Sequence, residues 1–160
     1  MTRGVRTIGP NENLVAAPQA MDELNIGVLP VCDGDRLIGV VTDRDIVVRG
    51  VAQDCLANET KVSDVMSAEA ISCFEDESID EVQTRMAQSQ IRRLPVIDHH
   101  QHLVGMLSLG DLATKGSSEE AGQALTEISE PAEPDRSGQS QASGGMGGGT
   151  GDQGGQSARL

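Results

Sequence analysis

Apolar residues recur at helical spacing near the middle of the chain. Ser78-Ile79-Asp80-Glu81 has the form of a capping box, in which the first and fourth side chains satisfy free N–H groups of a helix start. Ile79, Val82 and Met86 follow at spacings of three and four, so they share one face. The pattern predicts a helix of about three turns that begins after Ser78.

Short β-rich runs follow this helix. Arg93–Ile97 and Leu103–Leu107 flank the polar segment Asp98–His102, which is typical of a hairpin. A second helix is expected to begin at Ser108, because a hydroxyl side chain is a preferred N-cap. The order predicted here is helix, strand, strand, helix.

The first half of the chain predicts the same order. Asn13 is the expected cap of the first helix, but Pro18 falls where the helix interior should be, so it should delay the helix start or kink the helix. A strand near Arg6–Ile8, matched by Ala70–Cys73, completes a β-α-β-β-α unit. The hairpin strands are expected at Val28–Cys32 and Leu37–Val41, around the turn Asp33–Asp35, with a helix from Thr42.

The two halves are copies of one another. At an offset of 65 residues Leu29–Val31 matches Leu94–Val96. After one inserted residue in the second hairpin turn, Gly39 matches Gly105 and Asp45 matches Asp111. The chain therefore contains a tandem duplication of class α+β, with repeats expected at 1–60 and 61–115.

Composition changes after Lys115. Residues 116–160 hold 11 of the 19 glycines, with seven acidic and two basic residues. Such a segment buries too little apolar surface to offset the entropy of ordering its backbone, so we expect it to be disordered. It could serve as a solubilising spacer or as an interaction tail.

The charge balance excludes several classes of function. There are 25 acidic against 12 basic residues, a net charge of −13, and a single Phe, which argues against a nucleic-acid surface. No apolar run approaches the roughly 20 residues of a membrane span. Arg3 and Arg6 precede no apolar signal core, so a cytoplasmic location is expected.

Hydroxyl and carboxylate groups recur at the second helix of each repeat. Thr42 and Ser108 would place a hydroxyl beside unpaired N–H groups, where a phosphate is favoured, and Asp45 and Asp111 lie three residues on. A carboxylate there could accept hydrogen bonds from ribose hydroxyls. The same spacing also describes a simple capping box, so capping alone remains an alternative.

A phosphate would also need a cation in so acidic a chain. Arg44, Arg92 and Arg93 are the candidates, and strand alternation predicts that only one of Arg92 and Arg93 faces a given cleft. Arg44 could equally be a solvated helix residue beside two aspartates.

Metal, redox and catalytic chemistry receive less support. His99, His100 and His102 lie in a hairpin turn and are better explained as solvated. Cys32, Cys55 and Cys73 form no Cys-x-x-Cys pair, so a zinc ribbon or disulfide framework is not indicated. No nucleophile triad, phosphate-binding Gly-rich loop with Lys or zinc motif is present, so we do not expect an enzyme.

Both repeats resemble the CBS domain, which commonly occurs in pairs called Bateman modules. The resemblance is carried by Leu29–Val31 with Gly39–Ile46 and by Leu94–Val96 with Gly105–Leu112. Val62–Ser67 is similar to the short helix that leads into a repeat of this family. The resemblance implies pseudo-two-fold packing of the repeats and pairing of two chains. It extends to small stand-alone bacterial pairs, some linked to stress or hypoxia.

The resemblance also implies a ligand and its site. CBS pairs bind AMP, ADP, ATP or S-adenosylmethionine, with no required cofactor, and the similar modules of inosine monophosphate dehydrogenase are regulatory inserts beside a catalytic barrel that this chain lacks. The positions that match or adjoin the binding motif are Thr7, Thr42, Arg44, Asp45, Ser72, Arg93, Ser108 and Asp111.

Two functions of different class follow from these expectations. The chain could sense an adenosine nucleotide and signal to an unidentified regulated protein. Alternatively, its clefts could be empty, and it could act as a dimeric scaffold in a stress response.

Overall fold

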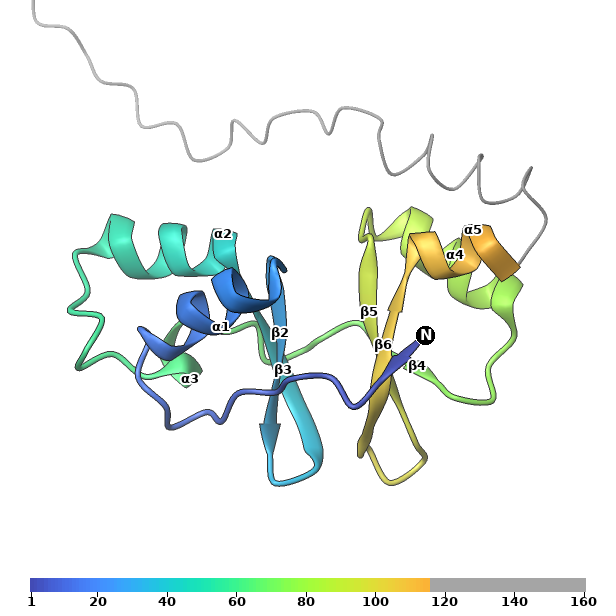
Figure 1. The fold of residues 1–160 in the computed structure, drawn as a ribbon, viewed down its shortest axis with the longest axis horizontal. Coiled ribbons are helices and arrows are strands. Elements are labelled where there is room, and N and C mark those ends of the chain that lie inside the picture. Colours follow the sequence, from blue (N-terminus) through green and yellow to red (C-terminus); the bar gives the residue numbers. More distant parts are fainter. Residues whose placement is uncertain (116–160) are drawn as a thin grey trace, which may run out of the picture. The chain divides into compact units, whose positions relative to one another are not determined.

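The helices and strands of the second repeat follow the predicted order. The computed structural model describes residues 1–115, so the expectation of disorder at 116–160 lies outside the described residues. Helix α4 spans Ile79–Gln88, and the Ser78 hydroxyl caps it by accepting a hydrogen bond from the N–H of Glu81. Strands β5 (Arg93–Ile97) and β6 (Leu103–Ser108) form the hairpin, and helix α5 (Leu109–Lys115) follows (Figure 1).

The first repeat has the same elements with a later first helix. Helix α1 spans Ala16–Leu24, so Pro18 lies in its first turn, where its missing N–H costs no helical hydrogen bond. The predicted delay of this helix is confirmed, although Asn13 accepts from the N–H of Ala16 rather than sitting at the N-cap. Strands β2 (Val28–Asp33) and β3 (Arg36–Thr42) then form the hairpin.

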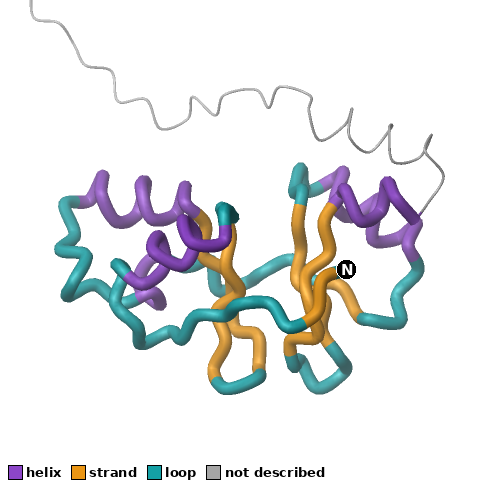
Figure 2. Tube along the Cα trace, in the orientation of Figure 1, coloured by secondary structure: helices purple, strands orange, loops and turns teal. Residues whose placement is uncertain are grey.

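A longer helical segment closes the first repeat. Helix α2 (Asp43–Asp45) continues as the π-helical turn η1 (Ile46–Gly50) and the 3-10 turn η2 (Val51–Gln53). A short helix, α3 (Val62–Val65), then leads into the second repeat. Each repeat thus carries its helices at one end of its hairpin and the hairpin turn at the other (Figure 2).

The first strand of each repeat differs from the prediction. Arg6–Ile8 is not a strand, and only Ile8 makes a parallel bridge, to Val31. In the second repeat the strand is β4 (Cys73–Phe74), which runs parallel to β5, rather than Ala70–Cys73. These segments pair only at their ends because the residues before them cross between the two repeats.

The crossing segments are exchanged between the repeats. Strand β1 (Thr2–Arg3) lies at the start of the first repeat but pairs antiparallel with β6 of the second. Conversely, Ser67 lies near the start of the second repeat and exchanges two backbone hydrogen bonds, of 2.8 and 3.0 Å, with Val40 in β3 of the first. The predicted pseudo-two-fold arrangement is confirmed, and each repeat completes the sheet of the other.

Glycine makes both crossings possible. A Cβ on Gly39 would lie 2.5 Å from the carbonyl oxygen of Ser67, and a Cβ on Gly105 would lie closer still to that of Thr2. No side chain larger than hydrogen fits there without moving the crossing backbone. Gly39 and Gly105, which the repeat pattern pairs, thus have the same structural role.

Each repeat has its own apolar core beneath its helices. In the first, Leu29, Val31 and Val41 of the hairpin are fully buried against Ala17 of α1. In the second, Leu94 and Val96 occupy the corresponding hairpin positions and are buried together with Met86 of α4. The hairpin turns also join across the repeats, because Leu37 donates to the carbonyl of Gln101 and Leu103 to that of Asp35. Within the described residues, none of the helices is both long enough and apolar enough to span a membrane.

Gly39→Ala should lower the free energy of unfolding by about 1–3 kcal/mol, because the added methyl overpacks against a backbone carbonyl. Gly110→Ala is the matched control, since its Cβ would approach nothing closer than 3.7 Å and alanine favours a helix. Urea denaturation followed by far-UV circular dichroism measures both. Equal stability of Gly39→Ala and the unmodified chain would contradict the close crossing.

Candidate functional site

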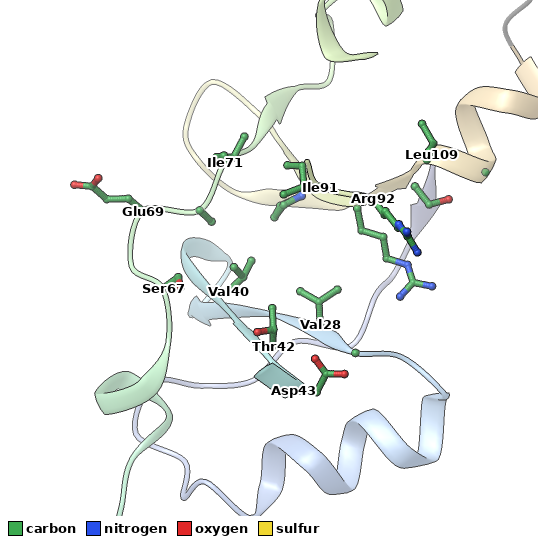
Figure 3. Close-up of a pocket in the computed structure, with 16 residues that line it drawn as sticks. Val28, Val40, Thr42, Asp43, Ser67, Glu69, Ile71, Ile91, Arg92 and Leu109 are labelled. Carbon is green, nitrogen blue, oxygen red and sulfur yellow. The ribbon is translucent and has the colours of Figure 1, made fainter. Parts of the chain in front are cut away.

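A cavity of about 1050 Å³ lies between the two repeats. Its size suits a small-molecule ligand, since such sites usually measure about 300–1,000 Å³. Figure 3 shows the first repeat on one wall and the second repeat on the other. The lining residues of the first repeat and the connecting segment are Gly27, Val28, Val40, Thr42, Asp43, Ser67, Glu69, Ala70 and Ile71. Those of the second repeat are Ile91, Arg92, Arg93, Pro95, Ser108, Leu109 and Gly110.

Aliphatic side chains form the middle of this cavity. Val28 and Val40 come from the hairpin of the first repeat, Ile71 from the connecting segment, and Ile91 from the residues before β5 (Figure 3). An apolar lining of this kind suits an aromatic ring system such as a purine. The connecting segment reaches the cavity because Ser67 is held against β3.

Arg92 and Arg93 both line the cavity, which corrects the expectation that only one of them could face it. Strand alternation does not apply to the pair, since β5 begins at Arg93 and Arg92 lies before the strand. The carbonyl of Arg92 accepts a hydrogen bond from the N–H of Leu109 at 2.9 Å, which holds it beside the start of α5. Within the described residues neither guanidinium makes an ion pair.

Thr42 and Asp45 form a complete capping box at α2. The hydroxyl of Thr42 donates to the Asp45 carboxylate at 2.7 Å, and the Thr42 N–H donates to the same oxygen at 3.0 Å. In return the Asp45 N–H donates to the Thr42 hydroxyl oxygen at 3.0 Å. The other carboxylate oxygen of Asp45 lies 3.4 Å from the guanidinium of Arg49.

Ser108 and Asp111 repeat this geometry at α5. The Ser108 hydroxyl donates to Asp111 at 2.6 Å, and the Ser108 N–H donates to it at 2.9 Å. The second oxygen of Asp111 lies 3.1 Å from the amino group of Met1. The hydrogen bond from the Ser108 side chain, with the backbone bond and the positive charge, lowers the pKa of Asp111 to about 2. Both aspartates are thus turned toward their own helix starts.

The site residues predicted from the sequence do not all lie in one cavity. Thr42, Arg93 and Ser108 line the large cavity, and Ser72 lines a smaller one of about 330 Å³. The residues outside both cavities are Thr7, Arg44, Asp45 and Asp111.

Asp43 is not among the residues predicted from the sequence, but it lines the large cavity. Its N–H donates to the carbonyl of Gly27 at 3.1 Å, and its carboxylate lies so close to Gly27 that a Cβ there would be 2.9 Å from it. The sequence held one indication of this role. Asp43 lies in the first helical turn after Thr42, so its side chain can reach the same cavity as the Thr42 hydroxyl.

The histidines and cysteines lie away from the large cavity. His99 contacts Asp76 and His102 contacts Asp98, each at 3.0 Å, and the described residues hold no group of three ligands placed around one metal ion. Cys32 is buried in β2, as predicted for a small apolar side chain. Burial raises the pKa of its thiol and that of Cys73, so neither is an activated thiolate.

Comparison with known proteins identifies the fold. The family model of the CBS domain matches residues 1–50 and 62–117 of this chain. The CBS domain-containing protein YhcV of Bacillus subtilis is 45% identical over 130 residues, which cover 81% of this chain and 91% of that protein. Hypoxic response protein 1 of Mycobacterium tuberculosis is 40% identical over 114 residues, covering 71% and 79%.

A solved structure and an enzyme add to this comparison. The crystal structure of Hypoxic Response Protein I with two coordinated zinc ions has a TM-score of 0.65 at 40% identity, over 71% of this chain and 92% of that one. Inosine-5'-monophosphate dehydrogenase of Thermoplasma acidophilum is 33% identical over 121 residues, 76% of this chain but only 24% of the enzyme. The similarity to the dehydrogenase is confined to its CBS domains. The chain belongs to the CBS-domain family, whose paired domains are regulatory ligand-binding modules.

Proposed function

We propose that this chain is a cytoplasmic sensor that binds an adenosine-containing nucleotide in the large cavity between its repeats, and is not an enzyme. The observation that carries the proposal is the lining of that cavity. Two arginines without an ion-pair partner among the described residues lie beside an apolar surface and the hydroxyls that begin two helices. A phosphate suits the arginines, and a purine suits the aliphatic walls.

Binding would regulate by acting on both repeats at once. The cavity is lined by both repeats and by the segment that connects them, so a ligand there contacts all three. A ligand shifts a conformational equilibrium only as far as it prefers one state. The candidate ligands are AMP, ADP, ATP and S-adenosylmethionine, and the regulated protein is unidentified. The hypoxic response relative favours a role in stress.

One observation favours the scaffold alternative. Asp45 and Asp111 are the expected ribose acceptors, but each accepts hydrogen bonds from the first residue of its own capping box. Neither lines the large cavity. A chain whose carboxylates only cap helices could keep the CBS fold without binding a nucleotide.

Titration calorimetry of the full chain tests the sensor proposal. We expect saturable binding of at least one of the four candidate ligands and a weakening of about tenfold or more in Arg92→Ala and Arg93→Ala, because charge-assisted hydrogen bonds to phosphate are lost. Arg6→Ala is the control, since Arg6 is exposed and outside both cavities. Absence of binding to all four ligands, checked by equilibrium dialysis, would leave the scaffold alternative.

Ser108→Ala tests the capping role of Asp111 separately. The folded-state pKa of about 2 lies below the ordinary value, so this carboxylate stabilises the fold above about pH 4 and loses that effect as the pH falls toward 2. At pH 7 the free energy of unfolding of the variant should be about 0.5–2 kcal/mol lower than that of the unmodified chain. Between pH 5 and pH 3 that free energy should fall less in the variant than in the unmodified chain, as measured by urea denaturation. Ser63→Ala is the control, because the Ser63 hydroxyl makes no hydrogen bond among the described residues. Identical urea midpoints for Ser108→Ala and Ser63→Ala would contradict the cap.

We also propose that two chains pair through the helices of the first repeat. Val47 and Val51 are 56% and 69% exposed, and Leu24 at the end of α1 is 45% exposed. Val47 also lines a groove between α1 and α2. A second copy of the chain suits this surface, because paired CBS modules commonly assemble through their helices.

Val47→Glu should shift the chain toward monomer in sedimentation equilibrium, because a buried charge would face an apolar partner surface. Leu56→Glu makes the same change at a side chain that is 65% exposed in the loop after η2, and should leave assembly unchanged. A monomeric unmodified chain, or equal assembly of both variants, would contradict this pairing surface.

A further inference from the structure

The charges that line the large cavity come from different repeats. Arg92 and Arg93 belong to the second repeat, and their counterparts in the first, at an offset of 65, are Gly27 and Val28. Asp43 belongs to the first repeat, and its counterpart in the second is the apolar Leu109. Divergence of the two copies has therefore made one wall of the cavity basic and the other acidic.

These opposed charges face the same space. Figure 3 shows Asp43 on one wall and Arg92 on the opposite wall. The main chain holds both in place, since the Asp43 N–H donates to Gly27 and the Arg92 carbonyl accepts from Leu109. Glu69 also lines the cavity, but its carboxylate points outward in Figure 3. Asp43 is therefore the acidic group that a ligand on the arginines would meet.

We propose that Asp43 makes this cavity selective for a nucleotide with a single phosphate, so that AMP binds more tightly than ADP or ATP. The inference rests on the proposed nucleotide site and adds its specificity. One phosphate can be neutralised by Arg92 and Arg93. Each additional phosphate adds negative charge to a cavity whose opposite wall carries the Asp43 carboxylate, and that repulsion weakens binding.

The preference can be measured by titration calorimetry of the full chain in about 0.15 M salt with EDTA, so that metal ions do not mask phosphate charge. We expect AMP to bind about tenfold more tightly than ATP. In Asp43→Asn the ratio should fall by about threefold to tenfold through tighter binding of ATP. Asparagine keeps an oxygen that can accept the Arg44 N–H, which Asp43 binds at 2.7 Å, so the helix start is retained.

Asp33→Asn is the matched control. It removes the same charge from an exposed position at the end of β2 that lines neither cavity, so the AMP to ATP ratio should not change. Thermal melts followed by circular dichroism establish that both variants are folded.

The outcomes separate this inference from the proposed function. Equal or tighter binding of ATP, or a ratio that Asp43→Asn leaves unchanged, overturns the role of Asp43 while the nucleotide site stands. Absence of binding to any nucleotide overturns both. A preference for AMP that falls in Asp43→Asn but not in Asp33→Asn supports the inference.

Discussion

The exchange of lead-in segments between the repeats is the contact on which the rest of the structure depends. An isolated hairpin would leave an unpaired edge at β3 or β6, which is unfavourable in water and prone to association. Here the backbone of Ser67 covers one edge and that of Thr2–Arg3 covers the other. Both approaches require a residue without a Cβ, at Gly39 and at Gly105. The duplication thus forms one folding unit rather than two adjacent ones.

The same exchange creates the cavity. Because Ser67 is held against β3, the residues that follow it, up to Ile71, run along the space between the repeats and line it. A ligand in that space contacts two hairpins and the segment that joins them. Regulation by such a ligand needs no separate relay, since the site is itself the junction between the two halves.

The two copies have kept their caps and changed their charges. Thr42 with Asp45 and Ser108 with Asp111 make nearly identical sets of hydrogen bonds, because each helix start has the same free N–H groups to satisfy. At the cavity wall no such requirement applies, and arginines in one copy replace Gly27 and Val28 in the other. Structural constraint preserved the caps, whereas the cavity lining was free to diverge.

The sequence by itself determined the repeat, the hairpins and the starts of α2, α4 and α5, because these depend on periodicity and on hydrogen bonds within three or four residues. It misplaced the first strand, since Thr2 pairs with Met106, which is distant in sequence and leaves no local pattern. It also included Asp45 and Asp111, which do not line the large cavity, and left out Asp43, which does. Which of several neighbouring side chains reaches the cavity depends on how the repeats pack against each other, and only the tertiary structure decided that.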